Sequence, residues 1–163
     1  MELVTRSAEE TRQVGRLLGQ EAQAGDLVLL SGPLGVGKTC FVQGLAQGLG
    51  VEEPVRSPTF VLVTEHQGRL RLYHVDLYRV DDPREALDLG LDEYVEGDGV
   101  CAVEWAEKAT PVFPRQHLWV QMEYRGQEGR LLLLRATGTR AERWLEDLTR
   151  RWEGAEAEVS GGS

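Results

Sequence analysis

The sequence has 163 residues, of which 41% are hydrophobic, so it is long enough for one domain with a buried core and too apolar for a disordered chain. Its net charge of −9 argues against nucleic acid as the primary ligand, and an acidic surface suits a basic protein partner or simply keeps the chain in solution. Two cysteines without metal-binding spacing, no apolar run near the ~20 residues of a membrane helix and no signal pattern predict a cytoplasmic protein without a membrane segment.

The first predicted elements surround a glycine-rich loop. Ser7 and Glu10 form a capping box, which starts an amphipathic helix. Residues 26–30, DLVLL, predict a short buried strand that leads into the loop. Residues 39–50 predict the helix that leaves the loop, with an apolar stripe along one side and Gly50 as its stop.

The remaining elements alternate between strands and helices. Asp-Pro at 82–83 starts a short helix, and the last amphipathic helix is followed by residues with almost no apolar surface to bury. The pattern predicts an α/β fold, a P-loop NTPase-like three-layer domain with a mixed β-sheet over residues 1–152. The further predicted elements are hairpin strands within 57–66 and 70–78, a short helix within 81–95, a strand at 99–105, a hairpin of 117–125 and 129–137, a helix at 139–152 and a disordered tail at 153–163.

The stretch SGPLGVGKTC contains the complete pattern G-x-x-x-x-G-K-[ST], as Gly32, Gly37, Lys38 and Thr39. Glycines let a loop take positive φ angles and bring backbone N–H groups close to an anion. The lysine ammonium reaches the β- and γ-phosphates, the next hydroxyl ligates Mg²⁺, and the following helix points its positive end at the same phosphates. Because strand, loop and helix come in this order, we interpret the stretch as a P-loop rather than a glycine-rich turn that binds nothing.

Two apolar strands end in an acidic residue, as a P-loop site requires for Mg²⁺. LYHVD ends at Asp76 and VCAVE ends at Glu104. The second strand is more uniformly apolar, so we expect it beside the P-loop strand, with Glu104 as a metal ligand opposite Thr39. Asp76 is expected further out, where it orients the attacking water or links the site to a partner. The alternatives are a turn or capping residue for Asp76 and an exposed edge-strand acid for Glu104.

Other candidate residues have weaker sequence support. Thr59, in Ser57-Pro58-Thr59, follows the P-loop helix at the place where other P-loop proteins have a loop that senses the γ-phosphate. The sequence supports equally well the alternative that this segment is only the start of a strand, fixed by the proline. The three histidines have no metal spacing, and His74 is expected to be packed or half-exposed rather than catalytic. Trp105 is expected in the core rather than over a nucleotide base.

Several classes of P-loop protein do not match. The residues after Asp76 are LYR, so the D-x-x-G pattern of GTPases is missing, and no [NT]-K-x-D pattern for guanine recognition is present. Arg79, Arg84 and Arg115 do not form the clustered lid pattern of a small-molecule kinase. ATP-dependent transporter subunits are larger and carry a signature that this sequence lacks.

The order and spacing of several motifs resemble the TsaE (YjeE) family, the small bacterial ATPases of tRNA threonylcarbamoyladenosine biosynthesis. The motifs are GPLGVGKTCFVQGLAQGLG, SPTFVLV, YHVDLYR, ALDLGLDEY and VEWAEK. The resemblance runs from about residue 7 to residue 137 and does not include the C-terminal helix. It implies a P-loop α/β domain with a mixed sheet that binds and hydrolyses ATP with Mg²⁺.

The resemblance also implies partners. Family members associate with TsaD and TsaB, the two-protein core that transfers the threonylcarbamoyl group to adenosine 37 of tRNA. ATP hydrolysis would reset this core between turnovers, and tRNA would be met only indirectly through the complex. The alternatives are a small-molecule kinase and a nucleotide-dependent switch without significant turnover.

The family's functional residues match positions in this sequence. Lys38, Asp76 and Glu104 match catalytic residues, and Thr39 and Glu104 match the Mg²⁺ ligands. Pro33 is a departure, because the family often has an acidic residue there, and it precedes the N–H groups that contact phosphate. The expected nucleotide-binding residues are Leu34, Gly35, Val36, Gly37, Lys38, Thr39, Thr59 and Arg130.

Overall fold

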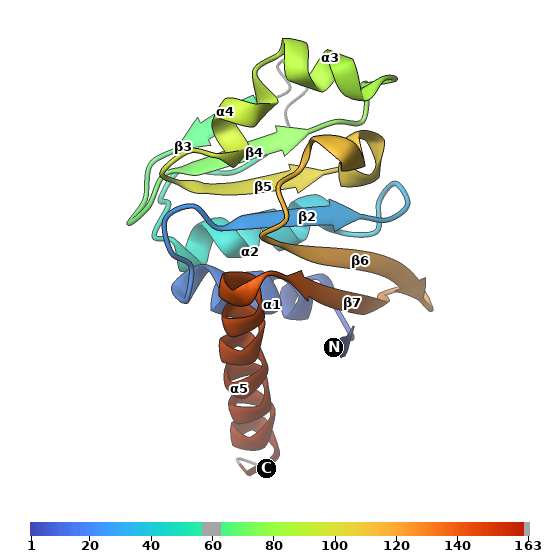
Figure 1. Cartoon of the computed structure of the whole chain (residues 1–163). Helices are drawn as coiled ribbons and strands as arrows, with labels where there is room; N and C mark the ends of the chain where they lie inside the picture. The colour runs from blue at the N-terminus through green and yellow to red at the C-terminus, as the bar shows by residue number, and fades with distance from the viewer. Residues whose placement is uncertain (57–62, 162–163) are drawn as a thin grey trace.

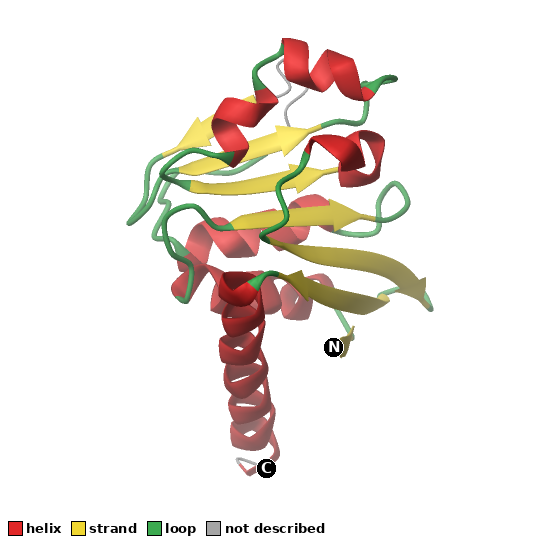
Figure 2. Ribbon diagram, in the orientation of Figure 1, coloured by secondary structure: helices red, strands yellow, loops and turns green. Residues whose placement is uncertain are grey.

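A mixed β-sheet runs through the centre of the structure, with the strand order β1-β7-β6-β2-β5-β4-β3 (Figures 1 and 2). The structure is a computed structural model and describes residues 1–56 and 63–161. The four central strands are parallel, and antiparallel strands extend the sheet on both sides. The strands are Glu2–Thr5 (β1), Leu27–Ser31 (β2), Val63–His66 (β3), Leu72–Asp76 (β4), Val100–Glu104 (β5), His117–Arg125 (β6) and Gly129–Thr137 (β7).

Helices cover both faces of the sheet, which confirms the predicted α/β, P-loop NTPase-like architecture. The helices α1 (Ala8–Gln20), α2 (Lys38–Gly48) and α5 (Thr139–Gly161) pack on one face. The short helices α3 (Pro83–Asp88) and α4 (Leu91–Val95) and the 3-10 helix η1 (Ala106–Val112) cover the other face over β2, β4 and β5. None of the described helices is long and apolar enough to cross a membrane.

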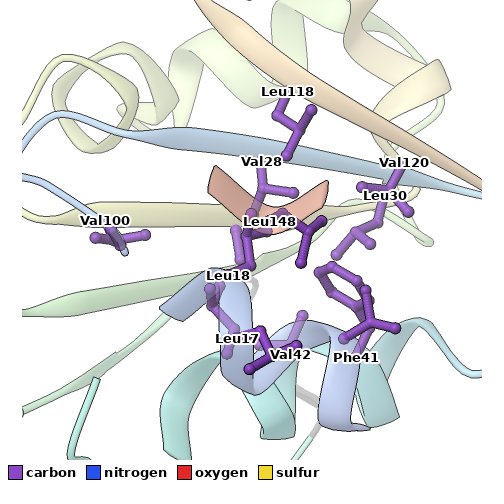
Figure 3. Close-up of a cluster of buried hydrophobic side chains, with 14 of the residues drawn as sticks. Leu17, Leu18, Val28, Leu30, Phe41, Val42, Val100, Leu118, Val120 and Leu148 are labelled. Carbon is purple, nitrogen blue, oxygen red and sulfur yellow. The ribbon is translucent and has the colours of Figure 1, made fainter. Parts of the chain in front are cut away.

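The two central strands are buried on both faces, because each lies between two layers of helices. Every residue of β2 and of β5 is buried. Figure 3 shows Val28 and Leu30 of β2 in the same apolar cluster as Leu18 of α1 and Phe41 of α2. Full burial of such a side chain stabilises the fold by about 1.5–3 kcal/mol. Apolar packing thus holds the P-loop strand in the middle of the sheet.

The predicted elements are found, with differences at their ends. Ser7 Oγ accepts a hydrogen bond from the Glu10 N–H at 3.1 Å, which confirms the serine cap of α1. The helix predicted within 81–95 is two helices, because Gly90 takes a φ of 82° and breaks it. Strand β1 and helix η1 were not predicted. The strand start predicted at 57–62, which includes Thr59, lies outside the described residues.

The C-terminal prediction is wrong over residues 153–161. We expected a disordered tail from residue 153, whereas α5 continues to Gly161 and extends away from the sheet (Figure 1). Glu153, Ala155 and Glu156 are good helix formers, so the helix propagates past the buried Trp152 without needing a core of its own.

Helices α1 and α2 approach so closely that only glycine fits at their contact. A Cβ atom at Gly15 would lie 2.2 Å from the Phe41 carbonyl oxygen, and one at Gly44 would lie 2.0 Å from the Arg12 carbonyl oxygen. Gly19 and Gly48, one turn further along each helix, are equally crowded by backbone atoms. Because both obstacles are backbone, neither helix can yield without moving as a whole, and this contact sets the position of α2 and hence of the P-loop.

We predict that Gly44→Ala destabilises the protein by about 1–3 kcal/mol or more, the typical effect of overpacking. The matched control is Gly154→Ala, the same change in α5, where an added Cβ meets nothing within 4 Å. Helix propensity favours alanine there by up to about 1 kcal/mol. Thermal unfolding measures both variants, and an unchanged melting temperature for Gly44→Ala would contradict the close contact.

Candidate functional site

The glycine-rich loop connects the end of β2 to the first residue of α2. Gly37 caps α2 with a φ of 115°, a left-handed conformation that favours glycine. The first N–H groups of a helix have no partner within the helix, so together with the helix dipole they form a site for an anion. The structure thus confirms the predicted order of strand, glycine-rich loop and helix, and phosphate binding by the loop stays a prediction.

The far side of the loop is held by the β6–β7 hairpin. The Tyr124 hydroxyl donates to the Leu34 carbonyl oxygen at 2.6 Å, and Arg130 Nε donates to the Val36 carbonyl oxygen at 2.7 Å. The Arg130 guanidinium lies 4.7 Å from the centre of the Tyr124 ring. The sequence predicts Arg130 as a nucleotide contact, and the structure shows it bound to the loop itself. Tyr124 was missed, because 90 residues separate it from Leu34.

Lys38 lies inside the loop with its side chain turned toward the start of the loop. Its ammonium donates to the carbonyl oxygens of Gly32 at 2.5 Å and Pro33 at 3.0 Å. It also lies 3.8 Å from the centre of the Trp105 ring, within the range of a cation–π contact. Burial lowers the pKa of Lys38, and the negative charge of Glu104 is the largest of the effects that oppose this shift.

The Glu104 carboxylate is the most enclosed acid of the site. Glu104 is 3% exposed, and its two carboxylate oxygens accept from the Thr39 hydroxyl at 2.9 and 3.1 Å. One of them, Oε2, also lies 2.5 Å from His74 Nε2. The burial of Glu104 in the strand next to β2 confirms its predicted central position and rules out an exposed edge-strand acid.

Asp76 ends the next strand and stands opposite Glu104 in the β4–β5 register. It is partly buried, and its Oδ1 accepts from the backbone N–H of Tyr78 at 2.9 Å. Burial raises the pKa of Asp76, while the Tyr78 hydrogen bond opposes this and the charge of Glu104 adds to it. The interpretation of Asp76 as a turn residue is thus confirmed, and its role toward a ligand stays a prediction.

Trp105 lies between the core and the site. The prediction that it belongs to the core is confirmed in part, because Trp105 packs against the apolar cluster on the η1 side of the sheet, but it is only half-buried and also faces Lys38. Among the described residues it is the one non-glycine residue with a positive φ, at 59°. Such a conformation persists where the surrounding contacts require it, and these include the Tyr78 ring, 5.0 Å away.

The described site residues meet where the parallel strands end, the edge at which α/β proteins bind ligands. They supply oxygen ligands, a hydroxyl from Thr39 and a carboxylate from Glu104, which suit Mg²⁺. The described part of the chain has no group of three or more His, Cys, Asp or Glu that could hold a metal.

Comparison with known proteins gives one family. Residues 5–132 match the family model for the threonylcarbamoyl adenosine biosynthesis protein TsaE. A tRNA threonylcarbamoyladenosine biosynthesis protein TsaE from Bacillus subtilis is 43% identical over 147 residues, which cover 90% of this chain and 92% of that relative. A protein of the same name from Nostoc is 47% identical over 126 residues, 74% of this chain and 76% of the relative.

A solved structure agrees with these matches. The crystal structure of YdiB from Bacillus subtilis superposes with a TM-score of 0.82 at 38% sequence identity. The match covers 93% of this chain and 95% of the other. At this identity the two chains share the arrangement of the whole domain.

We predict that Asp76→Asn raises the melting temperature at neutral pH. The pKa of Asp76 in the folded protein lies above the ordinary 3.8, so its stabilising contribution is complete below 3.8 and is lost as pH rises through the raised value. Asparagine keeps the acceptor for the Tyr78 N–H and has no charge to bury. The gain should therefore vanish in acid, and thermal unfolding of both proteins over a series of pH values measures this. A lower melting temperature at neutral pH would contradict the raised pKa.

Proposed function

Because the chain belongs to the TsaE family of tRNA threonylcarbamoyladenosine biosynthesis proteins, we propose that it binds and hydrolyses ATP with Mg²⁺ to drive that modification. The observation that carries the proposal is the convergence of Lys38, Thr39, Asp76 and Glu104 at one end of the sheet. A complete P-loop and two carboxylates at the ends of neighbouring strands are the parts that phosphoryl transfer requires.

The residues have separate roles in the proposed mechanism. The N–H groups of Leu34 to Gly37 and of the start of α2 bind the phosphates, and Lys38 turns from its own loop to the β- and γ-phosphates. Thr39 and Glu104 would hold the Mg²⁺, which would supply positive charge to neutralise the phosphates. Asp76 accepts a hydrogen bond from the attacking water and orients it.

Asp76 suits this role because of its environment. It stands on the neighbouring strand, one position across from Glu104, and is only partly buried, so water reaches it. Burial raises the pKa of its carboxyl toward the range in which a carboxylate accepts a proton more readily. Thr59 and Arg130 are further nucleotide contacts in the proposal.

We propose TsaD and TsaB as the partners, and a cytoplasmic location. The net charge of −9 supports action through protein partners, since direct binding of tRNA phosphates depends on basic side chains. Both cysteines are free, in keeping with a reducing compartment. In this proposal hydrolysis resets the TsaD–TsaB core, and the chain meets tRNA only within that complex.

We predict that phosphate release from ATP is slow for the chain alone, rises with TsaD and TsaB, and falls roughly 100-fold or more in Lys38→Ala, because an ammonium aimed at the phosphates is lost. Colorimetric phosphate release with and without the two partners measures this. The exposed Arg143→Ala on α5 serves as a control and should behave as wild type. No release under any condition would leave a nucleotide-dependent switch, and full activity of Lys38→Ala would exclude the loop as the site.

We predict that substitutions of Glu104 and Asp76 impair different steps. Glu104→Gln should raise the Mg²⁺ concentration needed for nucleotide binding and for hydrolysis, since it removes a charged metal ligand. Asp76→Asn should keep nucleotide affinity and lose turnover, the pattern of a group that acts mainly in the transition state. The measurements are ADP affinity across a Mg²⁺ titration and single-turnover hydrolysis. If the Mg²⁺ dependence moves in Asp76→Asn and not in Glu104→Gln, the roles are reversed.

A further inference from the structure

A buried histidine contacts the carboxylate of Glu104 from the side away from the P-loop strand. His74 is in β4 and has no exposed surface. Its Nε2 lies 2.5 Å from Glu104 Oε2, across 30 residues of sequence. Because an ionised carboxylate only accepts hydrogen bonds, Nε2 carries the hydrogen and donates it.

Packing alone does not explain a histidine at this position. Alternation along β4 places His74 on the same side as Leu72, and the register places it beside Ala102, both of which are fully buried. The other ring nitrogen, Nδ1, is buried and has no hydrogen-bond partner among the described residues. A leucine would fill such a space without an unpaired polar atom, so within the described residues the gain that the imidazole offers is its hydrogen bond to Glu104.

We propose that His74 is a positioning residue that holds Glu104 in place for Mg²⁺, an inference that rests on the proposed function. The glutamate side chain has three rotatable bonds, and the Thr39 hydroxyl contacts both of its carboxylate oxygens. The His74 N–H fixes the Glu104 atom Oε2 from the neighbouring strand β4, so that Oε1 stays on the side of Thr39. Hydrogen bonds of this kind orient metal ligands in other proteins, and their loss weakens metal binding about 10–100-fold.

The chain has a second histidine–glutamate pair that serves as a control. His66 of β3 is also buried, and its Nδ1 lies 2.7 Å from Glu53 Oε1. The Glu53 side chain is 55% exposed, and neither residue contacts the P-loop or the two site acids through the hydrogen bonds of the described residues. The two pairs share their chemistry and differ in whether the glutamate belongs to the site.

The test compares two amides that place the N–H donor differently. Glutamine reaches the position of Nε2, whereas asparagine reaches only that of Nδ1. We expect His74→Gln to keep the wild-type Mg²⁺ dependence of ADP binding, measured by calorimetry, and His74→Asn and His74→Leu to need roughly 10-fold or more Mg²⁺. ADP affinity in EDTA should be the same in all three. His66→Leu should lower the melting temperature and leave the Mg²⁺ dependence unchanged.

A double-mutant cycle separates positioning from a general loss of structure. Because His74 acts through Glu104, His74→Leu combined with Glu104→Gln should need no more Mg²⁺ than Glu104→Gln alone. Additive effects, or equal Mg²⁺ dependence of the Gln and Asn variants, would overturn the positioning role. If His74→Leu does not fold, the comparison of His74→Gln with His74→Asn tests the positioning role.

The outcomes also distinguish this inference from the function on which it rests. If ADP binding by the wild-type protein does not depend on the Mg²⁺ concentration, both the proposed function and the role of His74 are overturned. A wild-type protein with Mg²⁺-dependent binding, and His74 variants that all match it, would overturn the role of His74 alone.

Discussion

The parallel pairing of β5 with β2 is the contact on which the site depends. Its register places Glu104 beside Leu30, one residue before the end of the P-loop strand, and the pairing of β4 with β5 places Asp76 beside Glu104. A slip of one residue in either pairing would turn the carboxylate to the other face of the sheet. Because β2 and β5 are packed on both faces, a slip would force both helix layers to repack, so packing sets the geometry of the charged groups.

Burying charge at this edge opposes the stability that the packing supplies. Lys38 is 4% exposed and Glu104 is 3% exposed, and burial shifts the pKa of Lys38 down and that of Asp76 up. Each shift means that the charged form is less favourable here than in water. The opposite charges lessen this penalty for one another, and the Thr39 hydroxyl and the His74 N–H satisfy the most enclosed carboxylate. Such tension between charge and burial is common at functional sites, where the groups are arranged for a ligand rather than for stability.

The loop itself depends on elements that lie far from it in the sequence. Tyr124 and Arg130 bind its carbonyl oxygens from the β6–β7 hairpin, and Trp105 contacts Lys38 from the end of β5. The hairpin thereby fixes the carbonyl oxygens of Leu34 and Val36, while the Lys38 ammonium holds those of Gly32 and Pro33. The close contact of α1 with α2 then fixes the helix whose first residues complete the loop.

The sequence by itself determined the elements and the chemistry of the site. The period of apolar residues, the Ser7 cap and the P-loop pattern are local signals, so the α/β fold, the P-loop and the order of β2 and β5 could be predicted. Strand β1 was missed because it is defined by its pairing with the distant β7. The break at Gly90 and the extension of α5 past Trp152 follow from local residues whose effect was not recognised. Only the tertiary structure decided which residues contact one another: His74 contacts Glu104, Tyr124 contacts Leu34 and Trp105 contacts Lys38. These contacts join residues that are distant in sequence, and register and packing, which act across the whole sheet, bring them together.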